Sequence, residues 1–290
     1  MLDIHNTQIK EVNYEIKPID EPIKKINLQP TDNTLKIVCF KLDHELNNTL
    51  VQLVANQLYF SKSEILRWAQ RYFLKFLSEQ KDLFLLDSEY KFDEVTILES
   101  VSSKFAQIPL AIIDNLVLSD PRLYQSRSYL TRIGFKEYLR SREKIHTYLE
   151  EYNCYNKNKI KVIAFRIPGK WVDAINFLIK EHFYVSLSET MRMACQDLLL
   201  EIQQQEEFII GEWSSNSKDI LVLNEGPKVS ACSKMPLAYL SVIDSYVCSQ
   251  YFEDRTHFII LALKNFLETD FKIYTDHLGN LLKDCLNNHG

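Results

Sequence analysis

The sequence predicts a mainly α-helical fold with short β-strands, built from one strand–helix–helix unit that occurs four times. The motif Ser-x-Ser-Glu-x-x-Arg occurs at residues 61–67 and again at 186–192. In both places a segment with strand-like alternation and a segment with helical spacing precede the motif. Two weaker copies of this order lie between and after them, so the simplest origin is a two-unit block that was duplicated.

The first unit shows the pattern most clearly. Phe40 and Leu42 lie on one side of a predicted strand, and an apolar helix face follows from about residue 44. Ser61 then begins a second helix, because a serine hydroxyl can accept a hydrogen bond from the unpaired amides at a helix start. The third unit repeats this order, with its second helix beginning at Ser186.

The second and fourth units are recognised by their helix starts and by a proline after the strand. Ser126-Arg127-Ser128 and Asp254-Arg255-Thr256 stand where Ser61-Lys62-Ser63 stands in the first unit. AQIPLAII in the second unit aligns with SKMPLAYL in the fourth, which makes Gln107 equivalent to Lys234. Proline suits a strand-to-helix junction, since the first helical turn has no partner for the missing N–H.

The composition indicates a globular protein long enough for two ordinary domains. The chain has 290 residues, of which 46% are hydrophobic and 25% charged. No apolar run approaches the roughly 18 residues that a membrane span requires, and the N-terminus lacks the pattern of a secretion signal. Six cysteines without Cys-x-x-Cys spacing indicate reduced thiols. We therefore expect a cytoplasmic protein without membrane contact.

Motifs of enzymes and nucleotide-binding proteins are missing from the sequence. The six glycines never cluster, so no loop can bring its backbone close around a phosphate. Neither Gly-x-Ser-x-Gly nor His-Glu-x-x-His occurs, and no cysteine and histidine pair has zinc-finger spacing. We expect a non-catalytic protein with no cofactor and no metal site.

The repeated unit, a strand of about six residues followed by two helices, resembles the ribbon-helix-helix DNA-binding family. The resemblance covers residues 35–80, 101–142, 160–204 and 228–270 approximately, and it is strongest in the first and third units. In that family two units pair their strands in an antiparallel ribbon. The resemblance thus implies a mainly α fold with short β-ribbons, in which four ribbon-helix-helix units form two intrachain pseudo-dimers. The expected parts are a flexible arm at 1–33, double modules at 34–150 and 151–270, and a tail at 271–290 that can form a helix.

The resemblance implies that outward-facing strand residues contact bases in the major groove. If Phe40 and Leu42 face the core, every second residue of the strand, beginning with Ile37, faces outward. Long hydrogen-bonding side chains at one equivalent position of all four strands suit base edges, Arg and Lys toward guanine and Gln toward adenine. The predicted base contacts are Ile37, Cys39, Lys41, Ser103, Phe105, Gln107, Val162, Ala164, Arg166, Ser230, Cys232 and Lys234.

The starts of the second helices are predicted to hold phosphate, as in that family. Unpaired amides and the positive end of the helix dipole attract an anion there. Ser-x-x-Glu is also an ordinary capping arrangement, so both interpretations stay open. The predicted phosphate contacts are Ser61, Lys62, Ser63, Ser126, Arg127, Ser128, Ser186, Leu187, Ser188, Arg255 and Thr256.

The first hypothesis for the function is a transcriptional regulator that binds double-stranded DNA. The net charge of −5 weighs against it, because phosphate contacts supply most of the affinity for a duplex. The alternative is a protein-interaction scaffold whose modules have lost DNA binding, which the acidic balance and the apolar outward residues favour. An enzyme is the least supported class.

Overall fold

The computed structural model describes residues 35–79, 97–119, 125–153, 160–181, 183–204, 227–249 and 251–273. These residues belong to one compact unit. The predicted arm at 1–33 lies outside the described residues, and so does the tail beyond residue 273.

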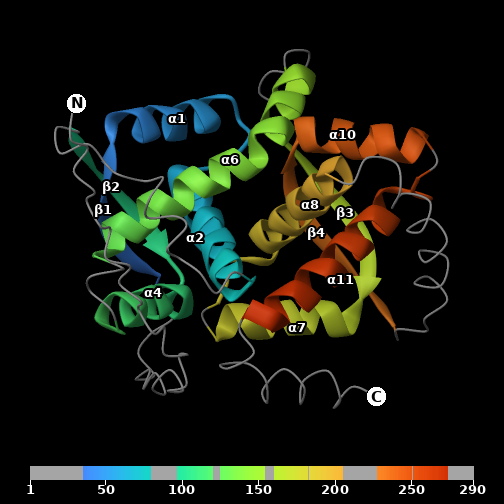
Figure 1. Cartoon of the computed structure of the whole chain (residues 1–290). Helices are drawn as coiled ribbons and strands as arrows, with labels where there is room; N and C mark the ends of the chain where they lie inside the picture. The colour runs from blue at the N-terminus through green and yellow to red at the C-terminus, as the bar shows by residue number, and fades with distance from the viewer. Residues whose placement is uncertain are drawn as a thin grey trace, which may run out of the picture. The chain divides into compact units, whose positions relative to one another are not determined.

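Twelve elements follow one another along the described chain (Figure 1). The first half of the chain forms β1 (Lys36–Asp43), α1 (His44–Ala55), α2 (Lys62–Glu79), β2 (Leu98–Phe105), α4 (Gln107–Ser119) and α6 (Arg127–Asn153). The second half forms β3 (Ile160–Pro168), α7 (Gly169–Lys180), α8 (Leu187–Gln204), β4 (Lys228–Pro236), α10 (Leu237–Cys248) and α11 (Arg255–Ile273).

The strands form two separate two-stranded antiparallel sheets, β1–β2 and β3–β4. Cys39 lies opposite Ser102 in the first sheet, and Ala164 lies opposite Cys232 in the second. Along each strand, buried and exposed residues alternate, because successive side chains of a strand point to opposite faces. One face of each sheet therefore packs on the helices, and the other faces solvent.

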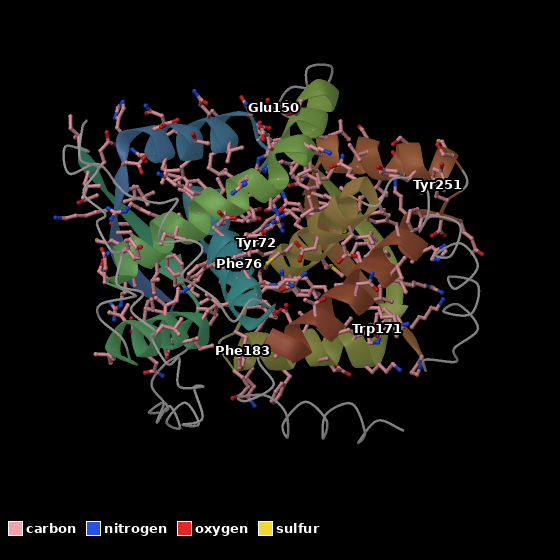
Figure 2. All side chains as sticks on the ribbon, in the orientation of Figure 1. Tyr72, Phe76, Glu150, Trp171, Phe183 and Tyr251 are labelled. Atoms are coloured by element: carbon pink, nitrogen blue, oxygen red, sulfur yellow. The ribbon has the colours of Figure 1, made fainter. Side chains whose placement is uncertain are left out.

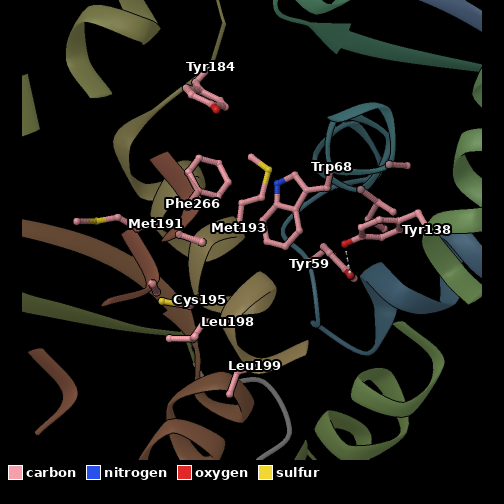
Figure 3. Close-up of a cluster of buried hydrophobic side chains, with 14 of the residues drawn as sticks. Tyr59, Trp68, Tyr138, Tyr184, Met191, Met193, Cys195, Leu198, Leu199 and Phe266 are labelled. Atoms are coloured by element: carbon pink, nitrogen blue, oxygen red, sulfur yellow. Dashed lines mark hydrogen bonds between the residues drawn. The ribbon is translucent and has the colours of Figure 1, made fainter. Parts of the chain in front are cut away.

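A single hydrophobic core joins the helices of both halves. Trp68 of α2 and Tyr138 of α6 come from the first half, and Met193 of α8 and Phe266 of α11 come from the second (Figure 3). All four side chains are buried. The core is thus filled by residues that are far apart in the sequence, and burying them supplies most of the driving force for folding.

A hydrogen-bonded polar cluster lies inside this core. The hydroxyl of Tyr59 contacts the hydroxyl of Tyr138 and Nε2 of His146, at 2.7 Å each (Figure 3 shows the first bond). Gln196 accepts a hydrogen bond from Tyr138 at 2.6 Å and donates to Tyr59 at 2.7 Å and to Tyr239 at 2.9 Å. These residues come from all four repeated segments, so the cluster satisfies buried polar groups that no single segment could satisfy alone.

The fold class expected from the sequence therefore needs correction. The mainly helical character and the two-stranded sheets hold, but four ribbon-helix-helix units forming two intrachain pseudo-dimers is the wrong description. The described residues form eight helices and two sheets around one core. Each two-stranded sheet joins two of the repeated segments, but the helices of both halves share one core, so neither half forms a separate pseudo-dimer.

Candidate nucleic-acid interface

The outer face of the β1–β2 sheet carries small, polar and basic side chains. Cys39 Sγ lies 3.1 Å from Ser102 Oγ across the middle of this face. A lysine stands toward each end, Lys41 on one strand and Lys104 on the other. The exposed residues of the face are Ile37, Cys39 and Lys41 on β1, and opposite them Lys104, Ser102 and Ser100 on β2.

Three residues predicted to face outward in the second unit lie in the interior instead. Ser103 is 2% exposed, Phe105 is 1% exposed and Gln107 is 8% exposed. Gln107 is not a strand residue at all, because α4 begins there. The outward residues of β2 are the alternate ones, and Lys104 takes the position that was assigned to Gln107.

The error in the second unit comes from the two prolines used to align it with the fourth. Pro236 immediately precedes α10, whereas Pro109 lies inside the first turn of α4. Either place is tolerated, since the first amides of a helix have no intrahelical partner, so a proline does not determine the strand register. The alternation of Val101 and Phe105 with polar residues was the signal that pointed to the correct face.

The outer face of the β3–β4 sheet has the same character. Its exposed residues are Val162, Ala164 and Arg166 on β3, and opposite them Lys234, Cys232 and Ser230 on β4. The strand alternation predicted these six positions, and all are exposed. Lys228 adds a further exposed cation at the start of β4.

The outer faces are basic although the chain as a whole is acidic. Exposed cations at outward positions are Lys41, Lys104, Arg166, Lys228 and Lys234. Among the described strand residues the carboxylates are Asp43, which is buried, and Glu99, which is on the opposite phase of β2. Hydrogen bonds from His44 and Asn47 hold Glu99 and lower the pKa of its carboxyl group.

The serines that begin the second helices act as caps. Ser61 Oγ accepts a hydrogen bond from the Glu64 amide at 3.2 Å, and Ser126 Oγ accepts one from the Tyr129 amide at 3.2 Å. Ser186 Oγ accepts one from the amide of the third residue beyond it at 3.3 Å. These hydroxyls satisfy helix amides, as the capping interpretation of the motif requires.

The second serine of each motif joins the helix start to a strand. Ser63 Oγ accepts from the backbone amide of Lys104 at 3.2 Å, and Ser128 Oγ accepts from that of Lys41 at 3.1 Å. Ser188 Oγ donates to the backbone carbonyl of Cys232 at 3.5 Å. The helix starts therefore lie directly beside the sheets.

The cations predicted to hold phosphate differ in their surroundings. Arg127 makes a bidentate ion pair with Asp114, and Arg255 makes the equivalent pair with Asp244. Lys62 donates to the side-chain oxygen of an asparagine at 3.4 Å and also interacts electrostatically with the Glu99 carboxylate. Leu187 packs against the core, and Thr256 is half-buried at the start of α11. A phosphate would thus compete with a carboxylate at both arginines.

The Glu and Arg of the repeated motif have a function that the sequence reasoning missed. Arg67 donates to both carboxylate oxygens of Glu189, at 2.7 and 2.6 Å, and to the backbone carbonyl of Lys104 at 2.7 Å. Arg192 donates to the Glu64 carboxylate at 2.8 Å and to the backbone carbonyl of Lys234 at 2.9 Å. Each motif thus supplies the acid for the other motif's arginine, and each arginine also holds a strand of its own half.

A second buried ion cluster lies between α2, α6, α8 and α11. Arg71 pairs with Asp197 at 2.6 Å and with Asp270 at 2.8 Å, and Arg142 pairs with Asp197 at 2.5 Å. Burial alone would raise the pKa of Asp197, but the two arginines more than offset it and the pKa is lowered. The cluster borders a hollow that is also lined by Tyr72, whose side chain is labelled in Figure 2. Lys75 and Glu201 also line this hollow, so cationic and anionic side chains both border it.

Comparison with known proteins gives no independent guide to the function. No protein-family model matches the chain, and no curated protein or solved structure matches it. Over the residues that the structure describes, no helix combines the length and apolar character needed to cross a membrane. Within the same residues, no three His, Cys, Asp or Glu side chains gather in a way that could hold a metal ion.

Proposed function

We propose that this protein is a non-catalytic, cytoplasmic DNA-binding protein, a transcriptional regulator that places the outer faces of its two sheets in the major groove of double-stranded DNA. The observation that carries the proposal is the row of exposed cations on these faces in a chain of net charge −5. A two-stranded ribbon fits the major groove, which is about 12 Å wide. The overall acidity therefore does not describe the surface that would meet the phosphates.

The side chains on these faces suit base edges. Lys41 and Arg166 can donate hydrogen bonds to guanine, and serine can pair with several bases. Ile37 is 68% exposed and Val162 is 61% exposed, and thymine methyl groups offer apolar partners for both. The resemblance to the ribbon-helix-helix family is in accord with this use of the strands.

The helix starts support the same orientation. Ser63 and Ser128 bind strand backbone at Lys104 and Lys41, so the first turns of α2 and α6 lie at the sheet margin. Amides at such positions can hold the phosphates that flank the groove. Lys62 is held less tightly than Arg127, because Arg127 makes an ion pair with a carboxylate, whereas Lys62 donates to an asparagine and interacts with Glu99 only electrostatically.

A second candidate is a protein-interaction scaffold. Exposed apolar side chains on and beside the sheets favour it, above all Ile37, Val162 and Ile97, which is 76% exposed. Apolar residues exposed on a surface can mark a protein partner as readily as a thymine-rich groove. The two candidates differ in whether removing charge or removing apolar area abolishes binding.

Duplex binding by paired variants tests the proposal. The full chain is first used to select bound fragments from a random duplex pool, and affinity for the enriched duplex is measured by fluorescence anisotropy at several salt concentrations. We expect a steep salt dependence. Lys41→Ala with Arg166→Ala should weaken binding by about 10-fold or more, because each base contact contributes roughly 1–3 kcal/mol.

Lys144→Ala with Lys180→Ala is the matched control, since it removes two exposed cations that lie on helices. It should change the affinity by less than about 3-fold, from long-range charge alone. Equal losses in both double variants would contradict the assignment of the sheet faces. No duplex affinity at low salt, together with a co-purifying protein, would favour the scaffold.

A further inference from the structure

The two copies of the repeated motif contact each other reciprocally. Arg67 of the first copy binds Glu189 of the second, and Arg192 of the second binds Glu64 of the first. The same pair of positions thus meets twice with the roles exchanged. Contacts of this kind arise when two like bodies are related by a two-fold rotation.

Other contacts obey the same exchange. Arg71 of α2 binds Asp270 of α11. In the repeat Gln196 of α8 is equivalent to Arg71, and Arg142 of α6 is equivalent to Asp270. These two residues also bind each other. In Figure 1 the helices that correspond, α1 with α7 and α4 with α10, lie diagonally across from each other about the centre occupied by α2 and α8. The two sheets are therefore related by an approximate two-fold axis.

The outer faces of the two sheets match position by position under this relation. An apolar residue lies opposite a lysine in both, and small residues lie opposite each other at the middle. A basic residue lies opposite a serine at the other end. The matched pairs are Ile37–Lys104 with Val162–Lys234, Cys39–Ser102 with Ala164–Cys232, and Lys41–Ser100 with Arg166–Ser230.

Each face also has a direction. A two-fold rotation about the centre of the first sheet would exchange Lys41 with Lys104, which are both cations. The same rotation would exchange Ile37 with Ser100, which differ in character. The second sheet has the same inequality, with Val162 where its partner strand has Ser230. The apolar residue thus marks one end of each face, and it does so on the equivalent strand of both sheets.

We propose that the DNA target consists of two like half-sites in inverted orientation on one duplex, one read by each sheet. This inference rests on the proposed function and adds the symmetry of the target to it. Like faces read like sequences, and a two-fold relation between the faces requires a pseudo-palindrome, whose half-site centres lie about 10 bp or a multiple of it apart. The buried Arg67–Glu189 and Arg192–Glu64 pairs hold the two faces in this relation.

Three duplexes built from the most enriched selected sequence test the symmetry. They carry one half-site, two in inverted orientation, or two in direct orientation, with the same length and spacing. We expect the inverted duplex to bind about 10-fold or more tightly than the direct one, because reversing one half-site mismatches several contacts. Inserting about 5 bp between inverted half-sites should reduce binding to the level of one half-site, since half a helical turn separates the grooves.

Ile37→Ser with Val162→Ser provides a second readout. Both residues are exposed, so the fold should tolerate the change, and each face becomes more symmetric. We expect this variant to lose its contacts with thymine methyl groups, so that it binds the inverted duplex more weakly and no longer prefers it to the direct duplex. Direct half-sites that bind as well as inverted ones, or an unchanged preference in the variant, would overturn the inferred symmetry while leaving DNA binding intact. Binding to none of the duplexes would instead overturn the proposed function.

Discussion

At the scale of single residues, Glu64 shows how one side chain serves two levels of structure. One carboxylate oxygen accepts a hydrogen bond from the Phe60 amide at 2.7 Å, which completes the cap of α2. The other accepts from Arg192 of the second half. Burial raises the pKa of Glu64, and Arg192 opposes that rise. The motif is thus at once a helix start and half of a cross-link between distant segments.

His146 makes the stability of the protein depend on pH. Burial lowers the pKa of its imidazole from the usual 6.5, and together with the nearby positive charge of Arg142 it brings this pKa to about 3. Below pH 6.5 the unfolded chain takes up this proton and the folded chain does not, until the pH reaches about 3. The contribution of neutral His146 to stability is therefore complete above pH 6.5. As the pH falls from 6.5 toward 3, the free energy of unfolding decreases by about 1.4 kcal/mol for each pH unit.

We expect His146→Gln to weaken this dependence. The amide of glutamine can still bond to the Tyr59 hydroxyl, but it takes up no proton in either state. Urea unfolding at intervals between pH 4.5 and pH 7.5 should give a slope that is smaller by roughly 1 kcal/mol per pH unit in the variant. Parallel curves for the two proteins would show that His146 is accessible to protons in the folded state.

At the scale of elements, the packing of α2 on α6 depends on a glycine. A Cβ atom at Gly134 would lie 2.9 Å from Phe73 Cβ and 3.5 Å from the backbone oxygen of Ala69. Alanine would favour an ordinary helix by up to about 1 kcal/mol relative to glycine. Here that gain is outweighed, because neither Phe73 nor the backbone at Ala69 can move aside without disturbing the buried core around them.

Gly134→Ala should therefore destabilise the protein by about 1–3 kcal/mol. Thr147→Ala is the control, since Thr147 is on the exposed side of the same helix and its replacement should cost less than about 0.5 kcal/mol. Chemical denaturation followed by circular dichroism measures both. A Gly134→Ala protein that is more stable than the parent would mean that the two helices can separate at no cost.

The strands show that the outward residues of an element can be predicted from its own sequence. Alternation along β1, β3 and β4 placed their outward residues, because the period of two is a property of each strand by itself. In β2 the proline alignment overrode that alternation and shifted the face by one residue. Lys104 is consequently the residue to be tested in the second unit, and Gln107 belongs to the interior.

At the scale of the whole molecule, the two halves satisfy each other's buried charges. Arg67 and Arg71 lie in the first half, and their acceptors Glu189, Asp197 and Asp270 lie in the second. A buried charge left without its partner costs about 3–5 kcal/mol, which is a large share of the stability of an ordinary domain. The halves therefore fold as one unit.

We expect a fragment of residues 31–150 to lack a cooperative fold on its own. Circular dichroism should show no sharp thermal transition for this fragment, and addition of residues 151–290 should restore one. Size-exclusion chromatography with light scattering would detect the restored complex. A fragment of residues 31–150 that is monomeric and unfolds cooperatively would contradict the shared core.

Local sequence was sufficient for the strand–helix–helix order, the capped helix starts and the outward residues of three strands. These features depend on residues within one or two turns of each other, where periodicity and capping chemistry act. The tertiary structure alone decided that Arg67 meets Glu189 and Arg192 meets Glu64, that Lys104 rather than Gln107 faces outward, and that one core serves both halves. Contacts between residues more than 100 positions apart leave no local period, because they depend on how finished elements pack.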